Sequence, residues 1–171
     1  MESNFLILIV DDIVRNLQVL GSMLKNNGYN VAAVTNGEQV LDFVDKRTPD
    51  LILLDIMMPG IDGFEVCQNL KSQEETKEIP VIFITVLNNL EDKLRGFEMG
   101  GVDFITKPFQ KQEVLARVQT HLELKKARER AENYVAKLKK RNQELEELKL
   151  ELNSQLEKGK QLHRQFLPDK L

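Results

Sequence analysis

The stretch Leu51-Ile52-Leu53-Leu54-Asp55 places a carboxylate directly after four consecutive apolar residues. A short unbroken apolar run is typical of a strand that is buried on both faces, as in a parallel sheet covered by helices. Asp55 then lies at the carboxyl end of the strand, where open α/β sheets bind their ligands. A buried charge needs a partner, so the other residues at this sheet edge determine what Asp55 does.

Strand and helix patterns alternate over residues 5 to about 120. Four more segments are predicted strands: 5–10, an apolar run that also ends in carboxylates, 29–34, which alternates only weakly, 81–85 and 102–106. Apolar residues at helical spacing follow these strands, and Asp12 and Asp62 are expected to cap two of the helices. Right-handed crossovers between parallel strands leave helices on both faces of the sheet. The sequence therefore predicts an α/β domain over residues 1–120, with a five-stranded parallel sheet.

The composition fits one ordinary domain plus an extension. The chain has 171 residues, and 42% of them are hydrophobic, so a core is expected. The net charge of -3 gives no overall attraction for nucleic acid or an anionic membrane. No apolar run reaches the roughly 18 residues of a membrane span, and the N-terminus lacks a signal-peptide pattern. With its single cysteine, Cys67, the chain is predicted to be cytoplasmic, without a nucleic-acid or membrane partner.

Polar side chains are expected at the carboxyl ends of four strands. These side chains belong to Asp11, Asp12, Asp55, Thr85 and Lys107. Clustered carboxylates repel one another unless a cation neutralises them, and oxygen ligands with open positions suit a hydrated Mg²⁺ ion. In such a site Asp55 is the expected nucleophile toward a phosphoryl group. Lys107 would neutralise the transferring oxygens, and Thr85 would donate a hydrogen bond to one of them.

Four motifs, in this order, closely resemble the receiver domain of two-component response regulators, which has a flavodoxin-like (βα)5 fold. The motifs are Ile9-Val10-Asp11-Asp12, Leu53-Leu54-Asp55-Ile56-Met57-Met58-Pro59-Gly60-Ile61-Asp62-Gly63, Ile84-Thr85 and Asp103-Phe104-Ile105-Thr106-Lys107-Pro108-Phe109. The resemblance covers residues 4 to about 120. It implies that a sensor histidine kinase transfers phosphate to Asp55, and that Lys107 binds the phosphoryl group. The implied Mg²⁺ ligands are Asp11, Asp12, Asp55 and the backbone carbonyl of Met57.

The resemblance also implies a conformational switch. Thr85 would move toward the phosphate while Phe104 rotates inward behind it. This movement would remodel the surface formed by the fourth helix, the fifth strand and the fifth helix. The family often has a cis peptide bond at the position of Lys107-Pro108, and proline lowers the cost of that isomer.

One position departs from the family pattern. The residue after the switch threonine is usually Ala or Gly, whereas this chain has Val86, a branched side chain close to where phosphate and water must enter. Met57 and Leu87 are also apolar, so no nearby side chain is expected to orient a hydrolytic water. We therefore predict a long-lived phosphoryl group on Asp55 and slow loading from small donors.

A long charged helix is predicted from about residue 110 to residue 158, because Pro and Gly are absent until Gly159. Leu138, Leu145 and Leu152 are spaced by seven, which is typical of a coiled coil and predicts a parallel homodimer over residues 121–160. Two registers remain open. These leucines pair either with Tyr134, Leu148 and Leu162 or with Val135, Asn142, Lys149 and Leu156. The alternative is a solvated helix that packs back on its own domain. Interleaved glutamates argue against a DNA-binding basic region.

Residues 161–171 are expected to link the coil to an output domain. Residues 162–168 resemble the segment that often precedes a bacterial protein phosphatase 2C-like serine/threonine phosphatase domain. The expected function is phosphorylation-dependent control of such an effector by a receiver and coil that are not themselves an enzyme, apart from catalysing phosphorylation of Asp55. Three alternatives are a complete adaptor that docks a partner protein, a fragment of a receiver–coil–nucleotide cyclase, and a metal-dependent hydrolase of free phosphate esters.

Overall fold

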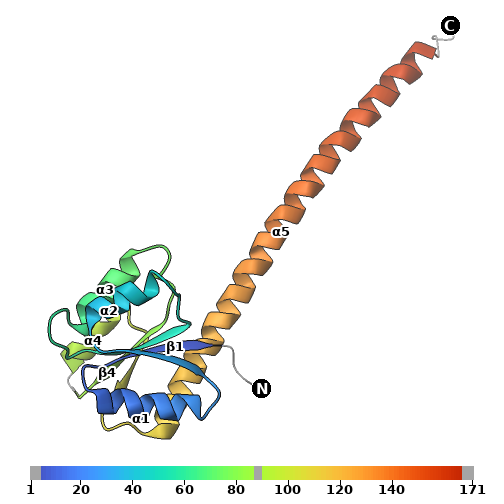
Figure 1. The fold of residues 1–171 in the computed structure, drawn as a ribbon. Helices are drawn as coiled ribbons and strands as arrows, with labels where there is room; N and C mark the ends of the chain where they lie inside the picture. The colour runs from blue at the N-terminus through green and yellow to red at the C-terminus, as the bar shows by residue number, and fades with distance from the viewer. Residues whose placement is uncertain (1–4, 87–89, 167–171) are drawn as a thin grey trace. The chain divides into compact units, whose positions relative to one another are not determined.

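Strands and helices alternate throughout the computed structural model, which describes residues 5–86 and 90–166 (Figure 1). The elements are β1 Leu6–Val10, α1 Val14–Lys25, β2 Asn30–Val34, α2 Gly37–Val44, β3 Leu51–Asp55, α3 Gly63–Ser72, β4 Val81–Thr85, α4 Leu90–Glu98, β5 Asp103–Thr106 and α5 Lys111–Phe166. The chain divides into two compact units, Met1–Lys125 and Lys126–Leu171. Helix α5 therefore contributes residues to both units.

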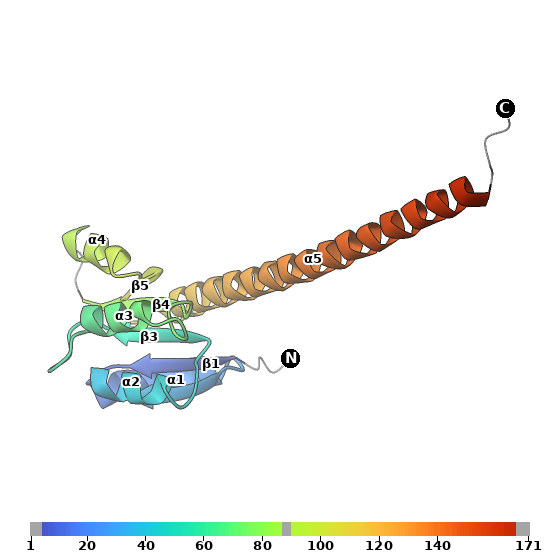
Figure 2. The ribbon, with the colours of Figure 1, turned by 90° about the horizontal axis from the view of Figure 1, so that it is seen from above.

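The sheet is parallel, and its described strands lie in the order β2-β1-β3-β4-β5. Figure 2 shows β1, β3, β4 and β5 following one another across the sheet. This is the flavodoxin-like order of a doubly wound sheet, so the predicted fold class is confirmed. The register pairs Val10 with Leu54, Asp55 with Ile84, and Thr85 with Thr106. The carboxyl ends of β1, β3, β4 and β5 consequently meet at one edge.

Two apolar layers cover the sheet, one on each face. On one face Leu20 of α1 and Val118 of α5 pack with residues of the central strands. On the other face α2 and α3 supply the buried side chains, including Val40 and Phe64 (Figure 1). All residues of β1, β3 and β4 are buried, which explains their unbroken apolar sequences.

One of the two predicted helix caps is confirmed, and the other is wrong. Asp62 forms a capping box with Glu65 at the start of α3, as expected. Asp12 does not cap α1, because the residue before this helix is Ile13 and no side chain caps it. The backbone N–H of Ile13 instead donates to Asp11 Oδ1 at 2.9 Å. Asp12 therefore has no capping role, and its carboxylate can join those of Asp11 and Asp55 at the sheet edge.

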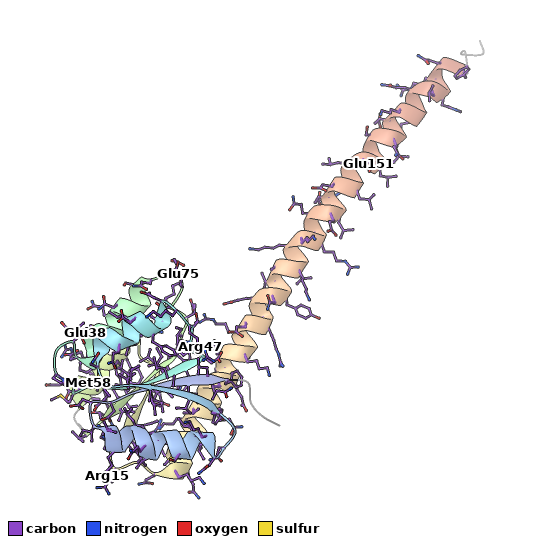
Figure 3. All side chains as sticks on the ribbon, viewed as in Figure 1. Arg15, Glu38, Arg47, Met58, Glu75 and Glu151 are labelled. Atoms are coloured by element: carbon purple, nitrogen blue, oxygen red, sulfur yellow. The ribbon has the colours of Figure 1, made fainter. Side chains whose placement is uncertain are left out.

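Helix α5 extends farther than its sequence pattern predicts. It continues through Gly159 to Phe166 rather than ending at residue 158. A single glycine costs a helix only about 1 kcal/mol relative to alanine, and the following residues contain no proline before Pro168. Every described residue of 126–166 is exposed in the single chain, and side chains project from all around this segment (Figure 3). Among the described residues, no helix is both long enough and apolar enough to cross a membrane.

An ion pair and a second polar contact hold the first turns of α5 beside β5 within the first unit. Asp103 Oδ1 accepts a hydrogen bond from Arg117 Nη1 at 2.6 Å, and His121 Nε2 lies 3.0 Å from Asp103 Oδ2. Burial alone would raise the pKa of Asp103, but hydrogen bonds from Arg117, His121 and the Phe104 N–H lower it overall. Asp103 is therefore held as a carboxylate that positions α5 beside β5.

Candidate functional site

The predicted site residues converge at the carboxyl edge of the sheet. Asp11 directly follows β1, Asp55 ends β3, Thr85 ends β4 and Lys107 directly follows β5. The side chains of Asp11, Asp55 and Thr85 are almost fully buried, whereas Asp12 is exposed. The parallel register brings together residues that lie up to 96 positions apart in the sequence, from 11 to 107. This edge is therefore a compact polar site above an apolar sheet.

Lys107 bridges the two buried carboxylates. Its Nζ donates to Asp55 Oδ2 at 2.7 Å and lies 2.8 Å from Asp11 Oδ2. Burial disfavours the ammonium, but its contacts with Asp11 and Asp55 outweigh that effect and raise the pKa of Lys107. Burial raises the pKa of Asp55, and the hydrogen bond from Lys107 offsets this only in part. Lys107 therefore stays protonated and supplies the positive charge that this edge requires.

Asn16 is a site residue that the sequence patterns did not reveal. Its Nδ2 donates to both oxygens of Asp11, at 3.0 and 2.9 Å. Together with Lys107 and the N–H of Ile13, Asn16 fixes the orientation of the Asp11 carboxylate. The available signal was spacing: a residue five positions after Asp11 falls in the first turn of α1, beside the end of β1.

The three aspartates can hold a divalent cation. Asp11, Asp12 and Asp55 each offer an oxygen, and these atoms all lie within 4.8 Å of one another. A set of carboxylate oxygens with room for water suits Mg²⁺, which usually keeps several water ligands. Two of these carboxylates are buried and one is exposed, so a cation could reach the group from solvent. The residues present therefore fit the predicted cofactor.

The predicted access residues are exposed. Val86 directly follows β4 and has 65% of its surface exposed, and Met57 has 62% exposed. The N–H of Met57 donates to Asp55 Oδ1 at 3.3 Å, so the loop after β3 is tied to the acidic group. Leu87, the other apolar residue predicted here, lies outside the described residues. The Lys107-Pro108 bond is cis, as the resemblance implied.

Phe104 lies behind this site in β5, with only 6% of its surface exposed. Its ring centroid is 5.5 Å from that of Phe83 in β4 and 5.1 Å from that of Phe97 in α4. The ring centroid of Phe83 is in turn 5.3 Å from that of Phe64 in α3. The ring of Phe104 is thus in the inward position, within an aromatic cluster that joins α3, β4, β5 and α4.

Comparisons with known proteins agree with this fold. The family model for the response regulator receiver domain matches residues 7–119. Response regulator PleD of Caulobacter vibrioides is 43% identical over 114 residues, which are 67% of this chain and 25% of PleD. The chain thus spans about a quarter of the length of this relative.

Solved structures show the same likeness. A putative response regulator from Chloroflexus aurantiacus is 34% identical, with a TM-score of 0.68 over 71% of this chain and 99% of the other. The BeF3-activated DrrB receiver domain is 35% identical, with a TM-score of 0.64 over 71% of this chain and 99% of that domain. The match to the family model ends at residue 119, within the first part of α5.

Proposed function

This chain belongs to the response regulator receiver domain family, and from that premise we propose that Asp55 accepts a phosphoryl group from a sensor histidine kinase. The observation that carries the proposal is the position of Lys107 Nζ, 2.7 Å from Asp55 Oδ2 and 2.8 Å from Asp11 Oδ2. A partly buried ammonium between two carboxylates can stabilise additional negative charge without reorganising its surroundings. That arrangement suits a carboxylate that intermittently becomes an acyl phosphate.

In the proposed transfer, Asp55 and Lys107 are already in contact, and Thr85 moves toward the phosphoryl group. An oxygen of Asp55 attacks phosphorus, the bond between phosphorus and the kinase histidine breaks, and the imidazole leaves with its electron pair. Lys107 then pairs with a phosphoryl oxygen, and the hydroxyl of Thr85 donates to another. Mg²⁺ held by Asp11, Asp12, Asp55 and the Met57 carbonyl would supply further positive charge to the phosphoryl oxygens.

The switch couples this site to α4, β5 and α5. Thr85 ends β4 and pairs in register with Thr106, two residues after Phe104. Phe104 is inward in this structure, and movement of Thr85 toward a phosphoryl group would leave room behind it that favours this inward position over an outward one. We propose that the surface of α4, β5 and α5 differs between the two states for this reason.

Phosphoryl acceptance is tested by intact mass spectrometry with Mg²⁺ and a phosphorylated kinase. We expect one added phosphoryl group per chain, none with Asp55→Asn, and an unchanged result with Asp45→Asn. Asp45 is a suitable control because it is an exposed aspartate at the end of α2. Phosphorylation of Asp55→Asn at the same level would overturn the proposal, and repeated turnover on a free phosphate ester would favour a hydrolase.

Val86 is expected to prolong the life of the phosphoryl group. Its exposed, branched side chain follows Thr85 and restricts the approach of water. Val86→Ala should speed loss of phosphate several-fold, whereas Val19→Ala, at an exposed valine on α1, should not. The rate of phosphate release after kinase removal measures this. Loss of phosphate from the natural chain within seconds would contradict the prediction, and Val86→Ala would then change little.

We propose that residues 121–160 form a parallel coiled coil with a second copy. Leu138, Leu145 and Leu152 are 55–57% exposed in the single chain, and their spacing by seven places them on one face of the helix. Leu145→Asn should shift sedimentation toward monomer, and Leu145→Pro should do so more strongly. Leu150→Asn should not, because Leu150 falls outside both registers. A natural chain that sediments as a monomer at micromolar concentration would rule out the coil.

The register of the coil can be determined with two further variants. Leu148 lies in the seam of one frame only, and Leu156 lies in the seam of the other. The variant that weakens the dimer, Leu148→Asn or Leu156→Asn, identifies the frame.

We propose that phosphorylation changes the packing of this coil and thereby controls an effector, with a serine/threonine phosphatase domain preferred over a nucleotide cyclase or a docked partner protein. The codons that follow Leu171 in the gene distinguish these effectors.

A further inference from the structure

A slot in α4 receives the ring of Phe104. Gly96 is the buried residue of this helix, and a Cβ built on it would overlap Phe104 Cζ. The same Cβ would lie 3.1 Å from Phe104 Cε1 and 3.1 Å from Phe83 Cδ2. The missing side chain of Gly96 therefore makes the space that the inward ring occupies.

The second ring beside the slot cannot move aside. Phe83 is fully buried and packs between the rings of Phe64 and Phe104. On another side it lies against Gly101, where an added Cβ would be only 2.7 Å from Phe83 Cδ2. Phe104, by contrast, lies next to Phe97, which is half exposed. A methyl group at position 96 would thus displace the ring of Phe104 rather than that of Phe83. The Phe104 ring would move toward solvent, on the side of the half-exposed Phe97.

We propose that Gly96 is a positioning residue of the switch, because it sets the free-energy difference between the inward and outward positions of Phe104. This inference rests on the proposed function, in which the inward ring accompanies phosphorylation of Asp55. Two sites that share one equilibrium influence each other by the same factor. Disfavouring the inward ring at Gly96 must therefore weaken binding of a phosphoryl mimic at Asp55, which belongs to another element.

The test compares two glycine variants. Gly96→Ala and Gly21→Ala both replace a buried glycine inside a helix, but the Cβ at position 21 would make an ordinary contact, 3.6 Å from Ile9 Cδ1. Binding of beryllofluoride with Mg²⁺ is measured by ¹⁹F NMR, and the Phe104 ring is followed by its own NMR signal. We expect Gly96→Ala to weaken binding about tenfold, near the lower end of overpacking costs, and Gly21→Ala to bind like the natural chain.

A double variant separates displacement of Phe104 from general damage to α4. Phe104→Ala removes the ring that the methyl group would strike, so adding Gly96→Ala to it should change beryllofluoride binding little. The double variant should also fold if the single Gly96→Ala variant does not. Unchanged binding and an unmoved Phe104 signal in Gly96→Ala would overturn the inference alone, as would equal losses in both backgrounds. No binding to the natural chain would overturn the proposed function with it.

Discussion

Replacing Lys107 by Gln is expected to lower the thermal midpoint of the protein markedly when divalent cations are absent. Asp11 and Asp55 are 0% and 3% exposed, and the Lys107 ammonium contacts both. Removing one partner of a buried ion pair typically costs about 3–5 kcal/mol, because a desolvated charge loses its compensation. For a domain of this size that cost corresponds to a decrease of roughly 10 °C or more. Calorimetry measures it directly.

Mg²⁺ and a second lysine provide the controls. Adding Mg²⁺ should recover part of the loss in Lys107→Gln, since a cation bound by the aspartates restores positive charge. Lys125→Gln should have a smaller effect, about 1 kcal/mol or less, because its partner Asp50 remains 30% exposed and water can solvate the carboxylate. Equal losses in the two variants would show that burial of the carboxylates does not govern the stability of this edge.

The sheet and its polar edge were predictable from sequence for one physical reason. A strand buried on both faces must be apolar throughout, so β1, β3 and β4 are visible as unbroken runs. A charge at the end of such a run must have a partner, and parallel strands place their carboxyl ends together. These two rules bring Asp11, Asp55 and Lys107 to one place without any knowledge of distances.

The contacts of individual side chains were harder to predict from the sequence than the sheet and its polar edge. Asp12 is a residue type that often caps helices, but it does not cap α1. Asp11 instead accepts the hydrogen bond from the N–H of Ile13, because the sheet sets the direction of the side chains at the end of β1. Asn16 has no unusual neighbours in sequence, and only the packing of α1 beside β1 brings its amide to Asp11. The pairing of Asp103 with Arg117 depends likewise on the seating of α5. Periodicity identifies elements, but it does not identify partners across them.

Gly96 illustrates the same limit for the proposed switch. A glycine inside a helix normally indicates a weakness of about 1 kcal/mol, and nothing in the sequence distinguishes Gly96 from Gly21. The structure distinguishes them, because one faces the ring of Phe104 and the other has ordinary room. The chain therefore accepts a poorer helix former in α4 at the position where a ring must enter.

Gly63→Ala should destabilise the protein more than Gly96→Ala, because the added Cβ would clash with backbone atoms rather than with a side chain. A Cβ at position 63 would overlap the carbonyl oxygen of Asp55 and lie 2.8 Å from Ile56 Cα. Backbone atoms cannot swing away as a ring can, and the Gly63 N–H also donates to the Ile56 carbonyl at 2.9 Å. We expect a loss of about 3 kcal/mol or more in the free energy of unfolding, measured by chemical denaturation.

The same substitution should also reach the functional site. Moving α3 away to relieve the clash would pull on the backbone of Asp55 and Ile56, and so on the Met57 N–H that donates to Asp55 Oδ1. Beryllofluoride affinity should therefore fall in the fraction of Gly63→Ala that remains folded, whereas Gly21→Ala should keep both its stability and its affinity. If Gly63→Ala were as stable as Gly21→Ala, close approach of α3 to the Asp55 backbone would not be a requirement of this fold. Only a residue without a side chain lets the helix start that close to the backbone of Asp55, which links the stability of α3 to the geometry of the acidic group.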